Sequence, residues 1–197
     1  MLLKPLKCPK CGSPIKGKER DLMLQCPACG SIQFFNRKTK DTEQITYTII
    51  APAAEGKGTL TYIPFWTVHA TLDVRNEDMS GGGIRRAVSG KHKLRGERIF
   101  YVCATEAIPE EVSRMWNMDL TISQPGLTAQ TDFRNAARIT MTMDEPVAKA
   151  AAEFLFLRYE TELPGILQDL DYTFSIKDTA IVYLPAWKNE TTYTLAI

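Results

Sequence analysis

The 197-residue sequence lacks features that define several large classes of proteins. No run approaches the ~18 consecutive apolar residues that a membrane-spanning helix requires. The net charge of +1 predicts neither a strongly basic nucleic-acid binder nor an acidic protein. The first residues, Met-Leu-Leu-Lys-Pro-Leu-Lys, are too short a stretch for a secretory signal, so we expect a cytoplasmic location. The apolar fraction of 44% is that of a folded chain rather than a disordered one.

Recognisable catalytic patterns are also missing. There are two histidines, His69 and His92, and neither stands at metal-ligand spacing from the other or beside a nucleophile motif. Cys103 lies in an apolar run, as a buried core residue does. The acidic pair Glu110-Glu111 comes at a predicted helix start, where the helix dipole favours negative charge. These absences favour a non-catalytic protein, and an enzyme with an unrecognised site stays open.

Four of the five cysteines stand in two Cys-Pro-x-Cys-Gly segments. The first contains Cys8 and Cys11, the second contains Cys26 and Cys29, and fourteen residues separate the two pairs. Two intervening residues let both thiolates of a pair point at one ion, and two such pairs complete a tetrahedral site with no open position. In a chain without an export signal this pattern indicates metal binding rather than disulfides.

On these cysteines, residues 8–36 resemble the zinc-ribbon superfamily. The resemblance implies a structural Zn²⁺ with four ligands: Cys8, Cys11, Cys26 and Cys29. Iron is the alternative metal, since it also accepts tetrahedral thiolates. Short strands are expected beside the metal at 23–25 and 32–35. A module this small buries little apolar surface, so we expect metal removal to unfold it and leave the rest of the chain folded.

Beyond the ribbon, alternating apolar and polar residues predict β-strands. The stretches 66–74 and 170–176 alternate most regularly, and Ile139, Met141 and Met143 also alternate with polar neighbours. The further strands that we expect are 45–50, 59–63, 98–104, 180–184 and 191–196.

Two helices are expected among these strands. The longer runs from about Asp144 to Tyr159 and is apolar around most of its circumference, which predicts burial on more than one side. The shorter runs from about Pro109 to Met118. This mixture predicts an α+β fold, with a zinc ribbon over 1–40, a charged linker at 37–43, and a mainly antiparallel sheet domain over 44–197.

A five-residue pattern, Tyr-x-Pro-x-Trp, occurs at 62–66 and again at 183–187. Because proline donates no hydrogen bond, each copy is expected at a sheet edge or a bend. Two interpretations stay open: anchors that place tryptophan rings in the core, or an aromatic platform for a ligand. The platform residues are Tyr62, Trp66, Tyr183 and Trp187. The repeat also leaves open whether the domain consists of two related halves.

The Pro-Phe-Trp segment at 64–66 and the Leu-Pro segment at 184–185 support a second resemblance. Together with the ribbon and the 144–160 helix, they resemble a group of uncharacterised bacterial zinc-ribbon proteins. This resemblance implies the same α+β arrangement and brings no activity with it.

Basic residues gather in the glycine-rich stretch 81–98. The candidate residues for binding an anion or a partner are Arg85, Arg86, Lys91, Lys93 and Arg95. Glycines let backbone N–H groups approach an anion, and the cations favour phosphate. The stretch lacks a P-loop ending and a dinucleotide fingerprint, and a solvated connection between strands is the alternative.

Three functions follow as hypotheses. The first is a non-catalytic adaptor or accessory subunit of a larger protein assembly, because the metal site is closed and the longer helix is unusually apolar. The second is nucleic-acid binding by the 81–98 loop and the basic ribbon, with Phe34 and Phe35 stacking on bases. The ribbon's basic residues are Lys4, Lys7, Lys10, Lys16, Lys18 and Arg20. The third is an electron-transfer subunit with iron in the ribbon.

Overall fold

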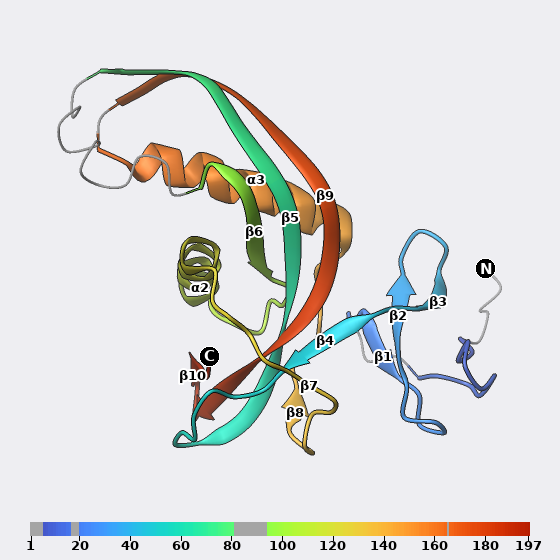
Figure 1. The fold of residues 1–197 in the computed structure, drawn as a ribbon. Coiled ribbons are helices and arrows are strands. Elements are labelled where there is room, and N and C mark those ends of the chain that lie inside the picture. Colours follow the sequence, from blue (N-terminus) through green and yellow to red (C-terminus); the bar gives the residue numbers. More distant parts are fainter. Residues whose placement is uncertain (1–5, 17–19, 81–93, 165) are drawn as a thin grey trace.

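Figure 1 shows the computed structural model, which describes residues 6–16, 20–80, 94–164 and 166–197. A small sheet, with one turn before it and one between its first two strands, forms the part that we call the ribbon (the described residues of 6–44). The strands of this sheet are antiparallel and follow chain order: β1 (Met23–Gln25), β2 (Ile32–Asn36) and β3 (Asp41–Gln44). We call the remainder, from residue 47 onward, the body.

Two long antiparallel strands form the centre of the body. β5 (Thr59–Ser80) and β9 (Ile166–Asn189) pair along their length and arch together over the longer helix (Figure 1). The sheet has the order β6-β5-β9-β4-β7, with β10 added to β9 and β8 to β5. The short strands are β4 (Tyr47–Ile50), β6 (Gly96–Cys103), β7 (Ala129–Gln130), β8 (Ala137–Arg138) and β10 (Thr192–Leu195).

The sheet is mixed, with antiparallel pairs in the majority. Only the pairs β4–β9 and β5–β8 are parallel within the described chain. Two helices accompany it there, α2 (Glu110–Ser123) and α3 (Glu145–Glu162). The α+β prediction is therefore confirmed. Among the described residues, neither helix is long and apolar enough to span a membrane.

Around residues 62–68 of β5 both faces of the sheet are buried, each against one helix, whereas Asp171, Thr173 and Ser175 farther along the β5–β9 pair are exposed. Along β5, Tyr62 and Trp66 pack in the core beneath α3, while Ile63 and Phe65 pack in the core beneath α2. Successive side chains of a strand point to opposite faces, which explains this division. On β9 an extra residue, Lys177, lies at a register shift, so the residues that pack in the core beneath α3 have even numbers before it and odd numbers after it: Leu170, Tyr172, Phe174, Ile181 and Tyr183.

The helices begin and end as local chemistry requires. Asp144 caps α3 by accepting a hydrogen bond from the N–H of Val147 at 3.3 Å, and Pro146 occupies the first turn. Helix α2 runs five residues beyond the predicted end at Met118, and Gln124 in left-handed conformation terminates it.

Helix α2 also satisfies the open edge of β6. Three backbone N–H groups of the strand donate to helical side chains: Cys103 to Asn117, Tyr101 to Thr121 and Ile99 to Gln124, at 2.8, 3.0 and 3.2 Å. These side chains take the place of a further strand, so the edge does not offer a row of unpaired groups for aggregation.

Two sequence-based predictions are wrong. The 37–43 stretch is not a linker, because residues 41–44 form β3 and pair with β2. The segment containing Ile139, Met141 and Met143 is not a strand. It is extended, but its N–H groups bond to three different places: Tyr62 O on β5, the Asp21 carboxylate of the ribbon, and Ala104 O.

The two Tyr-x-Pro-x-Trp segments pair with each other at the centre of the sheet. Pro64 lies opposite Tyr183, and Pro185 lies opposite Tyr62. They are not at a sheet edge. On its outer side, β5 pairs with β8 before Pro64 and with β6 after it. In the same way, β9 pairs with β4 before Pro185 and with β10 after it. The missing N–H therefore falls between two neighbours, and each proline carbonyl accepts an N–H at 2.9 Å, from Ala104 and Ala196 respectively.

Candidate metal centre and its attachment to the body

The four ribbon cysteines converge on one point. Their sulfur atoms all lie within 4.8 Å of one another, and the pairs Cys8–Cys29 and Cys11–Cys26 are separated by 3.7 and 3.6 Å. A Zn–S bond of about 2.3 Å places the corners of a tetrahedron about 3.8 Å apart. The donor set and its spacing therefore fit one tetrahedral metal ion.

The two cysteine turns have the same backbone geometry. Gly12 N–H donates to Cys8 O at 2.8 Å, and Gly30 N–H donates to Cys26 O at 2.9 Å. Both glycines have left-handed backbones, with φ of 73° and 71°. A side chain would strain this conformation, which explains why glycine follows each second cysteine.

Hydrogen bonds at the centre favour the thiolate form that binds metals. Hydrogen bonding with the Ser31 hydroxyl lowers the pKa of the Cys29 thiol. Burial acts to raise the pKa of Cys8, but hydrogen bonds from Ser31 and from nearby backbone groups outweigh it and bring that pKa to about 6. For Cys26, backbone hydrogen bonding acts to lower the pKa, yet burial and the neighbouring thiols raise it to about 11. The cluster thus shares its protons unevenly, and a metal would displace those that remain.

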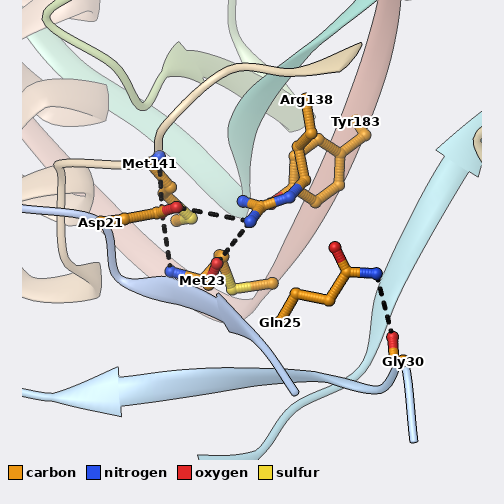
Figure 2. A network of polar contacts seen from close by, with 7 residues as sticks. All are labelled: Asp21, Met23, Gln25, Gly30, Arg138, Met141 and Tyr183. Atoms are coloured by element: carbon orange, nitrogen blue, oxygen red, sulfur yellow. Dashed lines mark hydrogen bonds and ion pairs between the residues drawn. The ribbon is translucent and has the colours of Figure 1, made fainter. Parts of the chain in front are cut away.

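A nearly buried ion pair fixes the ribbon to the body. Asp21 Oδ2 accepts a hydrogen bond from Arg138 Nη2 at 3.3 Å, and the side chains are 5% and 15% exposed. Arg138 also donates to Met23 O at 2.6 Å and to the Tyr183 hydroxyl at 3.1 Å. The other Asp21 oxygen accepts the N–H groups of Met23 and Met141 (Figure 2). One network therefore joins the ribbon, β8, β9 and the segment before α3.

Apolar packing continues across the same boundary. Leu24 of β1 packs beneath the metal site with Cys8, Ile15 and Cys26. Its neighbour Met23 points the other way and belongs to the main core of the body. Leu22 and Ile32 belong to that main core as well, so the ribbon and the body share it.

Two hollows lie along the seam between ribbon and body. The larger, of about 750 Å³, is lined mainly by the 132–137 turn, and the smaller, of about 370 Å³, by the second cysteine turn. Gln25 and Arg138 line both. In the body turn, Arg134 and Asn135 have left-handed backbones, and Asp132 accepts the N–H of Arg134 at 2.7 Å. Both hollows therefore lie beside Arg138, next to the Asp21–Arg138 pair.

The proposed aromatic platform is not a surface. Tyr62, Tyr183 and Trp66 are buried, and Trp66 donates from its indole N–H to Met143 O at 2.9 Å. Trp187 is half-buried, and its indole packs directly on Gly56. Tyr62, Trp66 and Tyr183 therefore serve as core anchors at inward-pointing strand positions and expose no broad face to a ligand.

The basic stretch is placed only in part. Arg85, Arg86, Lys91 and Lys93 lie outside the described residues, as does His92. Arg95 pairs with Glu77 at 2.6 Å, with side chains 25% and 7% exposed, so this cation already has an anionic partner. His69 lies 3.3 Å from Asp178 on the outer side of the sheet.

The ribbon phenylalanines are not free for base stacking. Phe34 packs edge-on against Trp66 with ring centroids 6.4 Å apart, and Phe35 packs between the ribbon core and the main core. Sequence reasoning missed Asp21 and Arg138 as paired residues. No local pattern marks them, since 117 positions separate them in the chain.

Residues 8–34 match the family model described as the NADH pyrophosphatase zinc ribbon domain. No curated protein and no solved structure matches the chain. The match covers the cysteine turns and the first two strands, and it assigns no activity to the body. The convergence of four thiols within the matched residues independently supports a zinc ribbon. The N-terminal segment of this chain is therefore a zinc ribbon.

Proposed function

We propose that this protein is a non-catalytic accessory subunit or adaptor of a larger assembly, in which a structural Zn²⁺ holds the ribbon in the shape that docks on the body. The main support for the proposal is that residues 23–26 contribute both a ligand of the metal site and a side chain of the main core. Cys26 converges with the other thiols, and Met23, three residues earlier, is buried in the main core. Four thiolates leave no coordination position for water or substrate, so the metal supports shape rather than a reaction.

The outer side of α3 supports partner binding. Val147, Ala150 and Phe154 follow one another at helical spacing on its exposed side, and Val147 and Phe154 are 52% and 67% exposed. The same helix buries Phe156 and Tyr159 completely or nearly so on its inner side. Large apolar side chains that share an exposed face mark protein contacts. We call this surface the α3 stripe.

Tagged protein expressed in its native host tests the proposal. Wild-type protein should retain one partner in stoichiometric amount, and Phe154→Ser should lose it, because a polar residue removes the largest apolar contact of the α3 stripe. Met115→Ser is the matched control, since Met115 is also a large exposed apolar residue on a helix, at 54%, but lies on α2. A partner retained equally by both variants would move the docking surface elsewhere, and a strictly monomeric wild-type protein would contradict the proposal.

Nucleic-acid binding is the second candidate function, and exposed lysines on the ribbon favour it. Lys7, Lys10 and Lys16 are all exposed. Binding through phosphates weakens steeply as salt concentration rises. A salt-dependent affinity for RNA or DNA that falls when these three lysines become glutamine would support this function. An affinity that does not change with salt would remove it.

Metal analysis of the purified protein decides between zinc and iron. The proposal expects one zinc per chain and a colourless solution. A ferric thiolate site absorbs visible light strongly, so a red protein with one iron per chain would favour the electron-transfer hypothesis instead.

A further inference from the structure

The two cysteine turns are sequence repeats whose serines have different surroundings. Residues 8–13 read Cys-Pro-Lys-Cys-Gly-Ser and residues 26–31 read Cys-Pro-Ala-Cys-Gly-Ser. In both turns the serine carbonyl accepts the N–H of the first cysteine at 2.8 Å. The Ser31 hydroxyl, however, lies 2.9 Å from Cys29 Sγ and 3.5 Å from Cys8 Sγ. Among the described residues, the Ser13 side chain makes no comparable contact with a thiol.

A glutamine on β2 holds the Ser31 hydroxyl in place. Gln33 is 2% exposed, and its side-chain amide donates to Ser31 Oγ at 2.8 Å. The same amide nitrogen lies 3.8 Å from Cys8 Sγ. Because the hydroxyl oxygen accepts from Gln33, its own proton is directed toward sulfur, with Cys29 nearest.

The four sulfurs also differ in accessibility. Cys8 and Cys26 are each 1% exposed, whereas Cys11 and Cys29 lie at the surface. A chelator or an electrophile therefore reaches Cys11 and Cys29 first. Of these two, Cys29 has a hydroxyl donor at hydrogen-bond distance, whereas the Cys11 sulfur lies 3.6 Å from another thiol, that of Cys26.

We propose that Ser31 and Gln33 form a clamp on the Cys29 side of the metal site, and that metal exchange and thiol modification therefore begin at Cys11. A hydrogen bond to a metal-bound thiolate withdraws charge from the sulfur, which lowers its reactivity and fixes its position around the ion. The inference rests on the metal-binding role proposed above. It adds which ligand is released first and which residues decide this.

Alkylation of the zinc-loaded protein with limiting N-ethylmaleimide tests the order. In this addition the Cys11 sulfur leaves the metal and bonds to one alkene carbon of the maleimide, while the other alkene carbon takes a proton from water. Neither oxidant nor reductant is consumed. Peptide mapping by mass spectrometry then gives the modified fraction of each cysteine, and a colorimetric chelator gives the rate of zinc release.

In wild-type protein we expect Cys11 to react several-fold faster than Cys29. Ser31→Ala should bring Cys29 to the rate of Cys11 and speed zinc release about tenfold, the effect that loss of an outer hydrogen bond to a ligand commonly has. Ser13→Ala is the matched control, because it makes the same change in the first turn, and it should behave as wild type. Ser31→Thr keeps the hydroxyl and should restore the wild-type order.

A spectroscopic signature separates a clamp from general loosening. In cobalt-substituted protein, Ser31→Ala should shift the sulfur-to-cobalt charge-transfer bands, whereas Ser13→Ala should leave them unchanged. Equal rates at Cys11 and Cys29 in the wild-type zinc protein, or identical effects of the two alanine substitutions, would overturn the clamp. A purified protein that binds no metal at all would instead overturn the proposed function, so the two failures are distinguishable.

Discussion

Asp21 of the ribbon and Arg138 of β8 form an ion pair at 3.3 Å that is almost closed to solvent. Both partners make further hydrogen bonds. Asp21 accepts from the N–H groups of Met23 and Met141. Arg138 donates to the carbonyl of Met23 and to the hydroxyl of Tyr183. Removal of one partner therefore leaves the other buried without its counter-charge. Such a loss is more costly than the pair's own net contribution.

Asp21→Ala should lower the free energy of unfolding by about 3–5 kcal/mol, because the Arg138 guanidinium would stay buried without an anion. Urea denaturation measures this loss. Arg20→Ala is the control, since Arg20 makes another ion pair from ribbon to body, with Glu106, and both of those side chains are about 70% exposed. That control should change stability little or not at all. Similar losses in the two variants would show that burial does not strengthen the Asp21–Arg138 pair.

A double-mutant cycle isolates the pairwise contribution. Arg138→Met should also destabilise the protein, and the variant with both substitutions should lose less than the sum of the two single losses. Strictly additive losses would mean that the two side chains act independently.

Metal removal should destabilise the body as well as the ribbon. Sequence reasoning predicts that the body stays folded without metal, but Leu22, Met23 and Ile32 belong to the body's core and depend on the ribbon for their position. We therefore expect chelation, or Cys26→Ser, to expose the ribbon to protease and to lower the melting temperature of the remaining structure. A body transition at an unchanged temperature would show that the shared core is dispensable.

The cysteines and the alternating strands were predictable because each signal is local. Thiol spacing within one turn specifies the metal site, and alternation at 66–74 and 170–176 indicates which side chains pack toward the core, with Ile176 the exception at 37% exposed. The strand boundaries predicted beside the prolines were wrong. The stretches 59–63 and 66–74 are parts of one strand, β5, because the neighbouring strand changes where Pro64 has no N–H to donate. That arrangement depends on residues elsewhere in the chain.

The attachment of the ribbon was not predictable for the same reason. Asp21 follows a charged stretch, and Arg138 lies in a short alternating segment, so neither is marked by its neighbours. The two meet only after β8 pairs with β5 and the ribbon has folded. Long-range polar networks of this kind carry no periodic signal in a single sequence.

Alkaline pH should weaken the fold through Tyr183. Burial raises the pKa of this hydroxyl to about 12, although the charge of Arg138 and its hydrogen bond act against the rise. The ordinary pKa is about 10, so the unfolded chain loses this proton first. The stabilisation is complete below about pH 10 and is lost as the pH rises from there to about 12.

Tyr183→Phe should therefore make the fall in unfolding free energy between about pH 10 and 12 less steep. Urea denaturation across this range provides the measurement. Tyr193→Phe is the control, because Tyr193 is only half-buried, on the β10 hairpin beside Lys188, whereas Tyr183 is fully buried. The control should leave the slope as in wild type. An identical slope in wild type and Tyr183→Phe would contradict the assignment.

Gly56→Ala should disturb Trp187. A methyl group at Gly56 would lie 2.3 Å from the indole Cδ1 and Nε1 atoms, too close for the ring to remain in place. We expect a loss of about 1–3 kcal/mol and a change in tryptophan fluorescence. Gly126→Ala is the matched control, since no atom lies within 4 Å of the added methyl group. Equal stability of both variants would show that the ring moves at no cost.

The long β5–β9 pair also orders events during synthesis. Its two strands are contributed by residues 59–80 and 166–189, so the ribosome must produce the 85 residues 81–165 between them before the central ladder can form. The cysteine turns need only residues 8–31 and can close around a metal much earlier. Non-local pairing is slow and leaves apolar strands exposed meanwhile. A nascent chain would therefore carry a finished ribbon and a β5 that still lacks its β9 partner, which makes this strand the expected site for chaperone engagement.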